Sequence, residues 1–284
     1  MDLIINEVSV NDYLTKSNLP ASDYVINPYI GCPHGCKYCY ACFMKRFTGH
    51  SEEWGTFIDI KLARSTMKIS KLKGKSVFLS SVTDCYNPFE KKYKLTRSIL
   101  EQLAHAEDCE VGISTKSSLI LRDLDVLRRI PNLKVAMSVN TLDDVFRSDM
   151  DNASSIGERL HALIAMHSNG IYTVLFMSPI FPEITDFKAI IEHTKDFIDE
   201  YWFENLNLRG EVKPRILSYI DTKYHDLIKL YRDIYLYGNK TYWSDLAEEI
   251  NNFCDKNGVS YKNYFYHEKL VQEKKEREKG LITL

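Results

Sequence analysis

The sequence predicts an α/β protein in which repeated βα units surround a parallel sheet, and three observations support this fold class. From about residue 76 onward, short runs rich in β-branched and aromatic residues alternate with amphipathic stretches of helical length. The 284 residues are 44% hydrophobic, which is enough to bury one large core. No repeat or low-complexity tract interrupts the pattern. We therefore start from a single large α/β domain.

Five runs are expected to form strands, and each except the last is followed by a helix-like segment. These runs cover residues 76–80, 110–114, 134–138, 172–177 and 202–208. A strand before or within the cysteine-rich region would make six. The first thirty residues contain two prolines and are expected to form an extended lead-in that ends in the turn-rich segment 27–31.

The helix between the third and fourth of these strands carries local signals at both ends. Ser155 and Glu158 have the spacing of a capping box, and Gly170 is expected to close the same helix. Its apolar face is expected to lie on the sheet. That face consists of Ile156, Leu160, Leu163 and Ile164.

After Pro214 the strand pattern stops. Residues 221–257 are predicted to be helical and are rich in aromatic residues, and the charged run 268–280 is expected to be a solvated helix. We therefore predict a core at residues 1–213 and a mostly helical extension at 214–284 that packs on it.

Charge and cysteine content exclude several classes of protein. The formal net charge of −2 argues against a protein that wraps nucleic acid through bulk charge, although it leaves room for a local basic groove. The N-terminus has no basic segment followed by an apolar run, and no stretch reaches the ~18 apolar residues of a membrane helix. We expect a cytoplasmic protein that has no contact with a membrane. Seven cysteines, four of them between positions 32 and 42, indicate metal-binding thiols rather than a disulfide framework.

The cysteine motif is the most informative feature of the sequence. Cys32, Cys36 and Cys39 are spaced so that one loop can direct three thiolates at an iron–sulfur cluster and leave its fourth iron open. Cys42 adds a fourth cysteine, so a closed ferredoxin-like cluster and a zinc site are the alternatives. Zinc sites usually split into two separated pairs, and ferredoxin motifs end in proline where this chain has Phe43. The spacing favours the open cluster.

The C-x-x-x-C-x-aromatic-C loop, with Tyr38 before the last cysteine, resembles the motif of the radical S-adenosylmethionine (SAM) superfamily. The longer stretch 27–40, together with RFTGH at 46–50 and Trp54-Gly55, is similar to the spore photoproduct lyase-related branch. Within that branch it most resembles the proteins called radical SAM mobile pair protein B. The resemblance extends over about residues 27–186.

This resemblance implies a fold, two cofactors and a chemistry. The fold is a partial (β/α)6 TIM-like barrel, with Cys32, Cys36 and Cys39 holding a [4Fe-4S] cluster. The open iron would bind SAM, and an electron from an external donor such as a flavodoxin would cleave SAM to a 5′-deoxyadenosyl radical that abstracts hydrogen from a substrate. The enzyme would be of the lyase or oxidoreductase type.

The resemblance also implies SAM-binding residues at the carboxyl ends of the strands, where barrels of this kind have their active sites. We expect Tyr38, Ser81, Thr83, Asp84, Lys116, Ser138, Asn140 and Arg159 to contact the cofactor. Each also has a plain structural alternative. Thr83 and Asp84 could cap a turn, Lys116 could be a surface charge, and Arg159 could pair with Glu158 or Asp151 on the surface.

Cys85 directly follows the end of the second strand and is the candidate for returning a hydrogen atom to a substrate radical. The alternative is a buried thiol without a chemical role, which is common for free cysteine.

Three classes of substrate or partner remain open. Nucleic acid is favoured by the lyase-related resemblance and by the basic stretches 71–75 and 91–94, whose lysines could also be ordinary solvated charges. A peptide or a partner protein is the second class, including a second radical SAM protein encoded as the pair of this one. The third is a non-catalytic iron–sulfur or zinc protein that binds nucleic acid.

Overall fold

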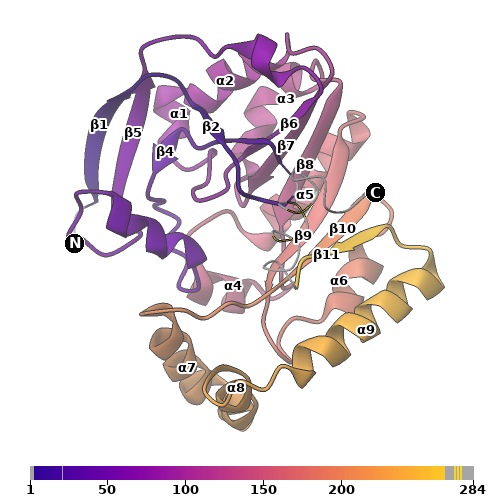
Figure 1. Ribbon diagram of the computed structural model, residues 1–284. Helices are drawn as coiled ribbons and strands as arrows, with labels where there is room; N and C mark the ends of the chain where they lie inside the picture. Colours follow the sequence, from indigo (N-terminus) through magenta and orange to yellow (C-terminus); the bar gives the residue numbers. More distant parts are fainter. Residues whose placement is uncertain (1–2, 21, 266–271, 273, 275, 277–284) are drawn as a thin grey trace.

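The computed structural model describes residues 3–20, 22–265, 272, 274 and 276. Its main feature is an open, curved sheet of eight strands, whose order is β11-β10-β9-β8-β7-β6-β3-β2 (Figure 1). All neighbours in it are parallel except β2 and β3. The strands are β2 (Leu14–Lys16), β3 (Tyr24–Ile26), β6 (Lys75–Leu79), β7 (Cys109–Thr115), β8 (Asn132–Ser138), β9 (Tyr172–Ile180), β10 (Glu200–Asn205) and β11 (Tyr261–Asn263).

The five predicted strands are confirmed as β6 to β10, although β10 covers residues 200–205 instead of 202–208. The sixth strand is β3, which precedes the cysteine loop and pairs parallel with β6. Within the described residues β2 and β11 form the two edges, so the sheet is a partial barrel and does not close. The predicted α/β fold with a parallel sheet is therefore correct.

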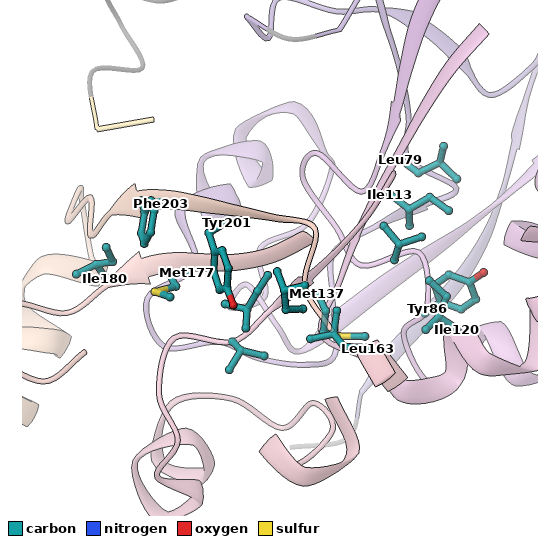
Figure 2. Close-up of a cluster of buried hydrophobic side chains, with 14 of the residues drawn as sticks. Leu79, Tyr86, Ile113, Ile120, Met137, Leu163, Met177, Ile180, Tyr201 and Phe203 are labelled. Atoms are coloured by element: carbon teal, nitrogen blue, oxygen red, sulfur yellow. The ribbon is translucent and has the colours of Figure 1, made fainter. Parts of the chain in front are cut away.

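Most of the helices cover one face of the sheet, whereas the helices at 212–223 and 228–235 lie apart from it (Figure 1). Side chains on that face form the main hydrophobic core, in which Met177, Tyr201 and Phe203 are buried (Figure 2). The α-helices are α1 (Glu90–Tyr93), α2 (Leu95–Leu103), α3 (Leu124–Leu127), α4 (Asp144–Met150), α5 (Ile156–Ser168), α6 (Phe187–Thr194), α7 (Val212–Lys223), α8 (Ile228–Tyr235) and α9 (Thr241–Asn257). Four 3-10 helices are η1 (Tyr40–Phe47), η2 (Ile69–Leu72), η3 (Ser118–Asp123) and η4 (His225–Leu227).

Helix α5 confirms the predicted capping box, because Ser155 accepts from the Glu158 amide while the Glu158 side chain accepts from the Ser155 amide. Gly170 follows its end with a φ of +72°. The predicted apolar face is wrong in one residue: Ile164 is 44% exposed. The buried face is rotated toward Ile156, Ala162, Leu163 and Met166, and it also includes a fully buried arginine, Arg159.

A second sheet in the order β1-β5-β4 lies beside the barrel (Figure 1). It consists of β1 (Ile4–Val10), β4 (Tyr29–Ile30) and β5 (Phe57–Ala63). The expected extended lead-in is therefore only partly right, since the first thirty residues form strands in both sheets. The buried Asp59 in β5 accepts one hydrogen bond from Asn6 and pairs with His50. These contacts satisfy the Asp59 carboxylate, whose charge made the strand hard to predict from the sequence.

The C-terminal part is helical as predicted, except that β11 returns to the main sheet and pairs with β10. Helix α7 packs close to the cysteine region: Arg215 pairs with Glu53, and the Lys37 ammonium lies 5.7 Å from the Tyr219 ring centroid. The division at residues 213 and 214 stays a prediction. Most of the charged run 268–280 lies outside the described residues. Among those described, no helix combines the length and apolar character that crossing a bilayer requires.

Candidate functional site

The three motif cysteines lie in the loop between β4 and η1, and all three line one large cavity of about 2200 Å³. Two tight turns shape this loop, in which the Gly35 amide donates to the Cys32 carbonyl over 3.2 Å and the Cys39 amide donates to the Cys36 carbonyl over 3.1 Å. The cavity follows the concave face of the sheet and its carboxyl-terminal edge. The motif thus faces the interior of the partial barrel.

Gly31 sets the entry into the loop. Its φ is +79°, and a Cβ at this position would lie 2.4 Å from the Phe57 carbonyl oxygen on β5. Only glycine fits such a close approach in the left-handed region. The Gly31 carbonyl in turn accepts from Thr83 Oγ1 over 2.7 Å, so the loop is fixed from β5 and from the segment after β6.

The chemistry of the three thiols fits an iron–sulfur cluster. Burial raises the pKa of each thiol, to about 12 for Cys36, and neighbouring cysteines raise it further. The thiolate is the metal-binding form, so a cationic metal centre is needed to offset this burial. The indole Nε1 of Trp54 is buried and has no nitrogen or oxygen acceptor among the described residues. It lies against Cys39, whose pKa burial raises, and the indole N–H lowers that pKa by a smaller amount.

The donor set of the loop consists of thiols. The cysteines of a four-iron cluster bind different irons, so three thiols that line one cavity suit such a cluster. A zinc site, in which all ligands bind the same ion at about 2.0–2.3 Å, stays the alternative.

Asp84 connects the cysteine loop to the sheet. Its carboxylate accepts from Thr115 Oγ1 and from the Lys116 amide, both over 2.8 Å, and lies 3.3 Å from Nε2 of His34 inside the motif. Burial alone would raise the pKa of Asp84, but His34 and these hydrogen bonds hold it at about 2. Asp84 is thus a buried anion that positions the loop and also lines the cavity, and its contact with the cofactor stays a prediction.

A second buried network holds Tyr38 and Arg159. Arg159 is fully buried and donates to Asp151 Oδ1 over 2.7 Å and to the carbonyls of Ser138 and Ser154 over 3.1 and 2.8 Å. The Tyr38 hydroxyl donates to the other Asp151 oxygen over 3.2 Å. Arg159 does pair with Asp151, as its structural alternative supposed, but inside the protein instead of on the surface.

The remaining predicted SAM contacts divide into two groups. Ser81, Lys116 and Ser138 line the cavity together with the cysteines, as Tyr38, Thr83 and Asp84 also do, and Lys116 Nζ lies 5.8 Å from the Tyr38 ring centroid. Asn140 and Arg159 do not line it, and Asn140 donates to the Pro179 carbonyl over 2.9 Å. The structure thus brings the first group to the site and places the second behind it.

The other cysteines occupy different surroundings. Cys85 is fully buried in the hydrophobic core and does not line the cavity, and burial raises its pKa well above the ordinary value. Its carbonyl accepts from Thr96 Oγ1 over 2.6 Å. Cys42 lies in η1, lines the cavity, and its thiol donates to the Tyr40 carbonyl over 3.8 Å. The structure does not bring Cys85 to the motif cysteines.

Four residues at or behind the site were not among the predicted ones. His34, Trp54 and Glu204 line the cavity, and Asp151 lies behind it. His34 is within the cysteine motif and Trp54 is in the quoted stretch, so both could have been selected from the sequence. Asp151 and Glu204 have no sequence signal, because only the fold brings them close to the loop.

Comparison with protein families and relatives agrees with this geometry. A family model described as the radical SAM superfamily matches residues 26–197. An uncharacterized protein of Methanocaldococcus jannaschii is 33% identical over 265 residues, which cover 93% of this chain and 98% of the relative. An uncharacterized protein of Mycobacterium tuberculosis is 24% identical over 235 residues, covering 76% and 68% of the two chains. The narrower likeness to mobile pair protein B stays a prediction.

Solved structures share the fold. Spore photoproduct lyase in complex with a dinucleoside spore photoproduct has a TM-score of 0.56 at 16% identity, covering 77% of this chain and 66% of the lyase. Streptococcus suis SuiB bound to S-adenosylmethionine has a TM-score of 0.54 at 12% identity, covering 84% of this chain and 49% of SuiB. The chain therefore spans just under two thirds of the lyase and about half of SuiB.

Proposed function

Because this chain belongs to the radical SAM superfamily, we propose that it is an enzyme in which Cys32, Cys36 and Cys39 hold a [4Fe-4S] cluster with one iron open to SAM. The observation that carries this proposal is the common placement of the three cysteines, Ser81 and Lys116 on one cavity. When bound, the cluster supplies one electron that cleaves SAM to methionine and a 5′-deoxyadenosyl radical.

The residues of the chain orient the cofactor and exclude water. Lys116, whose Nζ lies near the Tyr38 ring, supplies a positive charge beside the motif that suits the SAM carboxylate. Ser81 and Ser138 supply hydroxyl groups on the same wall of the cavity. We assign Thr83, Asp84 and Arg159 the role of holding this wall in place, since their polar atoms already have partners within the protein.

For the substrate we propose nucleic acid, and the cavity rim supports this class. Arg46 lies 5.6 Å from the ring centroid of Phe43, which is 43% exposed, and both residues line the cavity together with Lys45 and Arg209. Cationic and exposed aromatic side chains together suit a single strand, because phosphates need the charges and bases stack on the rings. The lysine stretches 71–75 and 91–94, which the sequence suggested as nucleic-acid contacts, do not line the cavity. We therefore propose the residues of the cavity rim as the nucleic-acid contacts instead.

A peptide is the second candidate. SuiB, which shares the fold, has been solved with its precursor peptide bound. An external one-electron donor is needed for either substrate, and we propose a flavodoxin-like protein for this role. A second radical SAM protein encoded as a pair stays a prediction.

The test is production of 5′-deoxyadenosine from SAM by reconstituted protein under anaerobic reducing conditions. We expect production by the native protein and by Cys109→Ala, because Cys109 is buried in β7 outside the motif. We expect none from Cys36→Ala. Salt-dependent binding of nucleic acid without any cleavage of SAM would instead support a non-catalytic binding protein.

A further inference from the structure

An aromatic cluster lines the concave face of the sheet within the same cavity as the cysteines. Phe176 on β9 and Trp202 on β10 have ring centroids 5.6 Å apart, and Tyr264, which follows β11, lies 5.7 Å from Trp202. Tyr201 and Phe203 belong to the core under the helices (Figure 2). Because alternating side chains on a strand point to opposite faces, Trp202 between them faces the cavity. These three rings are the aromatic floor.

Trp202 has an unsatisfied donor in this floor. The residue is only 8% exposed, and its Nε1 is buried without a hydrogen-bond partner among the described residues. Its neighbour Tyr201, which faces the helices, is satisfied, because its hydroxyl lies 2.8 Å from Thr194 Oγ1. Buried donors without acceptors are rare in native proteins. The indole N–H therefore indicates a ligand that brings an acceptor.

The charges around the floor select the kind of ligand. Lys134 donates to the buried Glu200 over 3.0 Å, and Lys262 lies 3.5 Å from the same carboxylate, so these three side chains leave one net positive charge, which the Glu204 carboxylate on the same cavity offsets. Glu204, two residues after Trp202 on the same face of β10, also lines the cavity and accepts from Ser178. A phosphate or carboxylate is disfavoured next to Glu204. A neutral planar ring that carries both an acceptor and an N–H donor matches the indole and the carboxylate.

We propose that the aromatic floor binds one base of the nucleic-acid substrate, with Trp202 Nε1 donating to an acceptor on the edge of the base. This inference rests on the proposed nucleic-acid function and specifies how the same cavity would recognise it. A base that reaches the floor has left its stack, so the preferred substrate is single-stranded or has a flipped base. The cationic rim would hold the backbone.

The experiment measures binding of a short single-stranded DNA of mixed sequence to the reconstituted protein by fluorescence anisotropy, with SAM at saturation. Trp202→Phe keeps a ring and removes the N–H. Trp243→Phe is the matched control, because Trp243 is equally buried and lines the same cavity, but its Nε1 is not a buried donor without a partner. We expect about a tenfold loss of affinity for Trp202→Phe and no loss for Trp243→Phe. An abasic strand of the same length should bind both variants and the native protein equally.

The outcomes separate the two proposals. If the native protein binds no DNA, the nucleic-acid function fails, and the base site fails with it. If the native protein binds DNA and Trp202→Phe binds equally well, only the base site is wrong. If Trp202→Phe loses affinity for SAM and keeps its affinity for DNA, the floor holds the adenine of the cofactor, which also overturns the base site. Far-ultraviolet circular dichroism confirms that each variant is folded.

Discussion

Replacing Arg159 with methionine tests whether this residue holds the fold or binds the cofactor. Arg159 is fully buried and its guanidinium forms a 2.7 Å ion pair with Asp151, which is only 4% exposed. Removing one partner of a buried pair leaves the other as an uncompensated charge, at a cost of about 3–5 kcal/mol. The carbonyls of Ser138 and Ser154 also lose their donors. We therefore expect Arg159→Met to lower the free energy of unfolding by about 4 kcal/mol.

The assay is urea denaturation of the reconstituted protein under anaerobic conditions, followed by far-ultraviolet circular dichroism. Arg232→Met is the matched control, because Arg232 pairs with Asp221 over 3.5 Å and both side chains are more than 40% exposed. An exposed pair contributes less than about 1 kcal/mol. The double variant Arg159→Met with Asp151→Asn should cost less than the sum of the single changes, since neutralising Asp151 removes the unpaired charge.

A different result would refute this reasoning. If Arg159→Met keeps the free energy of unfolding within about 1 kcal/mol of the native value and instead weakens SAM binding many-fold, then Arg159 contacts the cofactor directly. That outcome would support the SAM-binding role that the family resemblance implies for Arg159.

Three further predictions concern the cysteine loop and its support. Trp54→Phe removes the indole N–H beside Cys39 and should make the reduction potential of the cluster more negative, and an unchanged potential in an EPR-monitored titration would contradict this. Gly31→Ala should reduce the iron bound per protein severalfold, because its Cβ has no room, whereas Gly157→Ala, in helix α5 with nothing within 4 Å, should bind iron normally. Burial alone would lower the pKa of His50, but hydrogen bonds to two carboxylates raise it. The protonated His50 therefore stabilises the fold at about pH 6, and this stabilisation is lost as pH rises through the raised pKa. The urea concentration at the unfolding midpoint should decrease between about pH 6 and about pH 8.5, and His50→Gln should make that decrease smaller.

Much of the barrel could be predicted from the sequence because its strands are short runs rich in β-branched and other apolar residues. β7, β8 and β9 are buried on at least one face and contain few charges, so their pattern is clear. β5 contains Asp59 and Lys61, and its strand character becomes visible only when His50 and Asn6 satisfy the buried carboxylate. A partner distant in sequence cannot be inferred from the strand alone.

The site shows the same division between local and distant information. The spacing of the three cysteines is local, and the structure places them on one cavity as predicted. The partners of Asp84 and Arg159 are set by the fold, and both residues prove to be enclosed by hydrogen bonds within the protein. Ile164 was predicted to lie on the sheet-facing side of α5, but it is exposed, and the buried side contains Arg159, Ala162 and Met166.

The most direct test of the account is the EPR spectrum of the reduced, reconstituted protein with and without SAM, for the native chain and for Cys42→Ser. We predict a [4Fe-4S] signal that changes when SAM is added, in both proteins, because three cysteines leave one iron free for the cofactor. A signal insensitive to SAM, a cluster lost in Cys42→Ser, or stoichiometric zinc in place of iron would contradict the central claim.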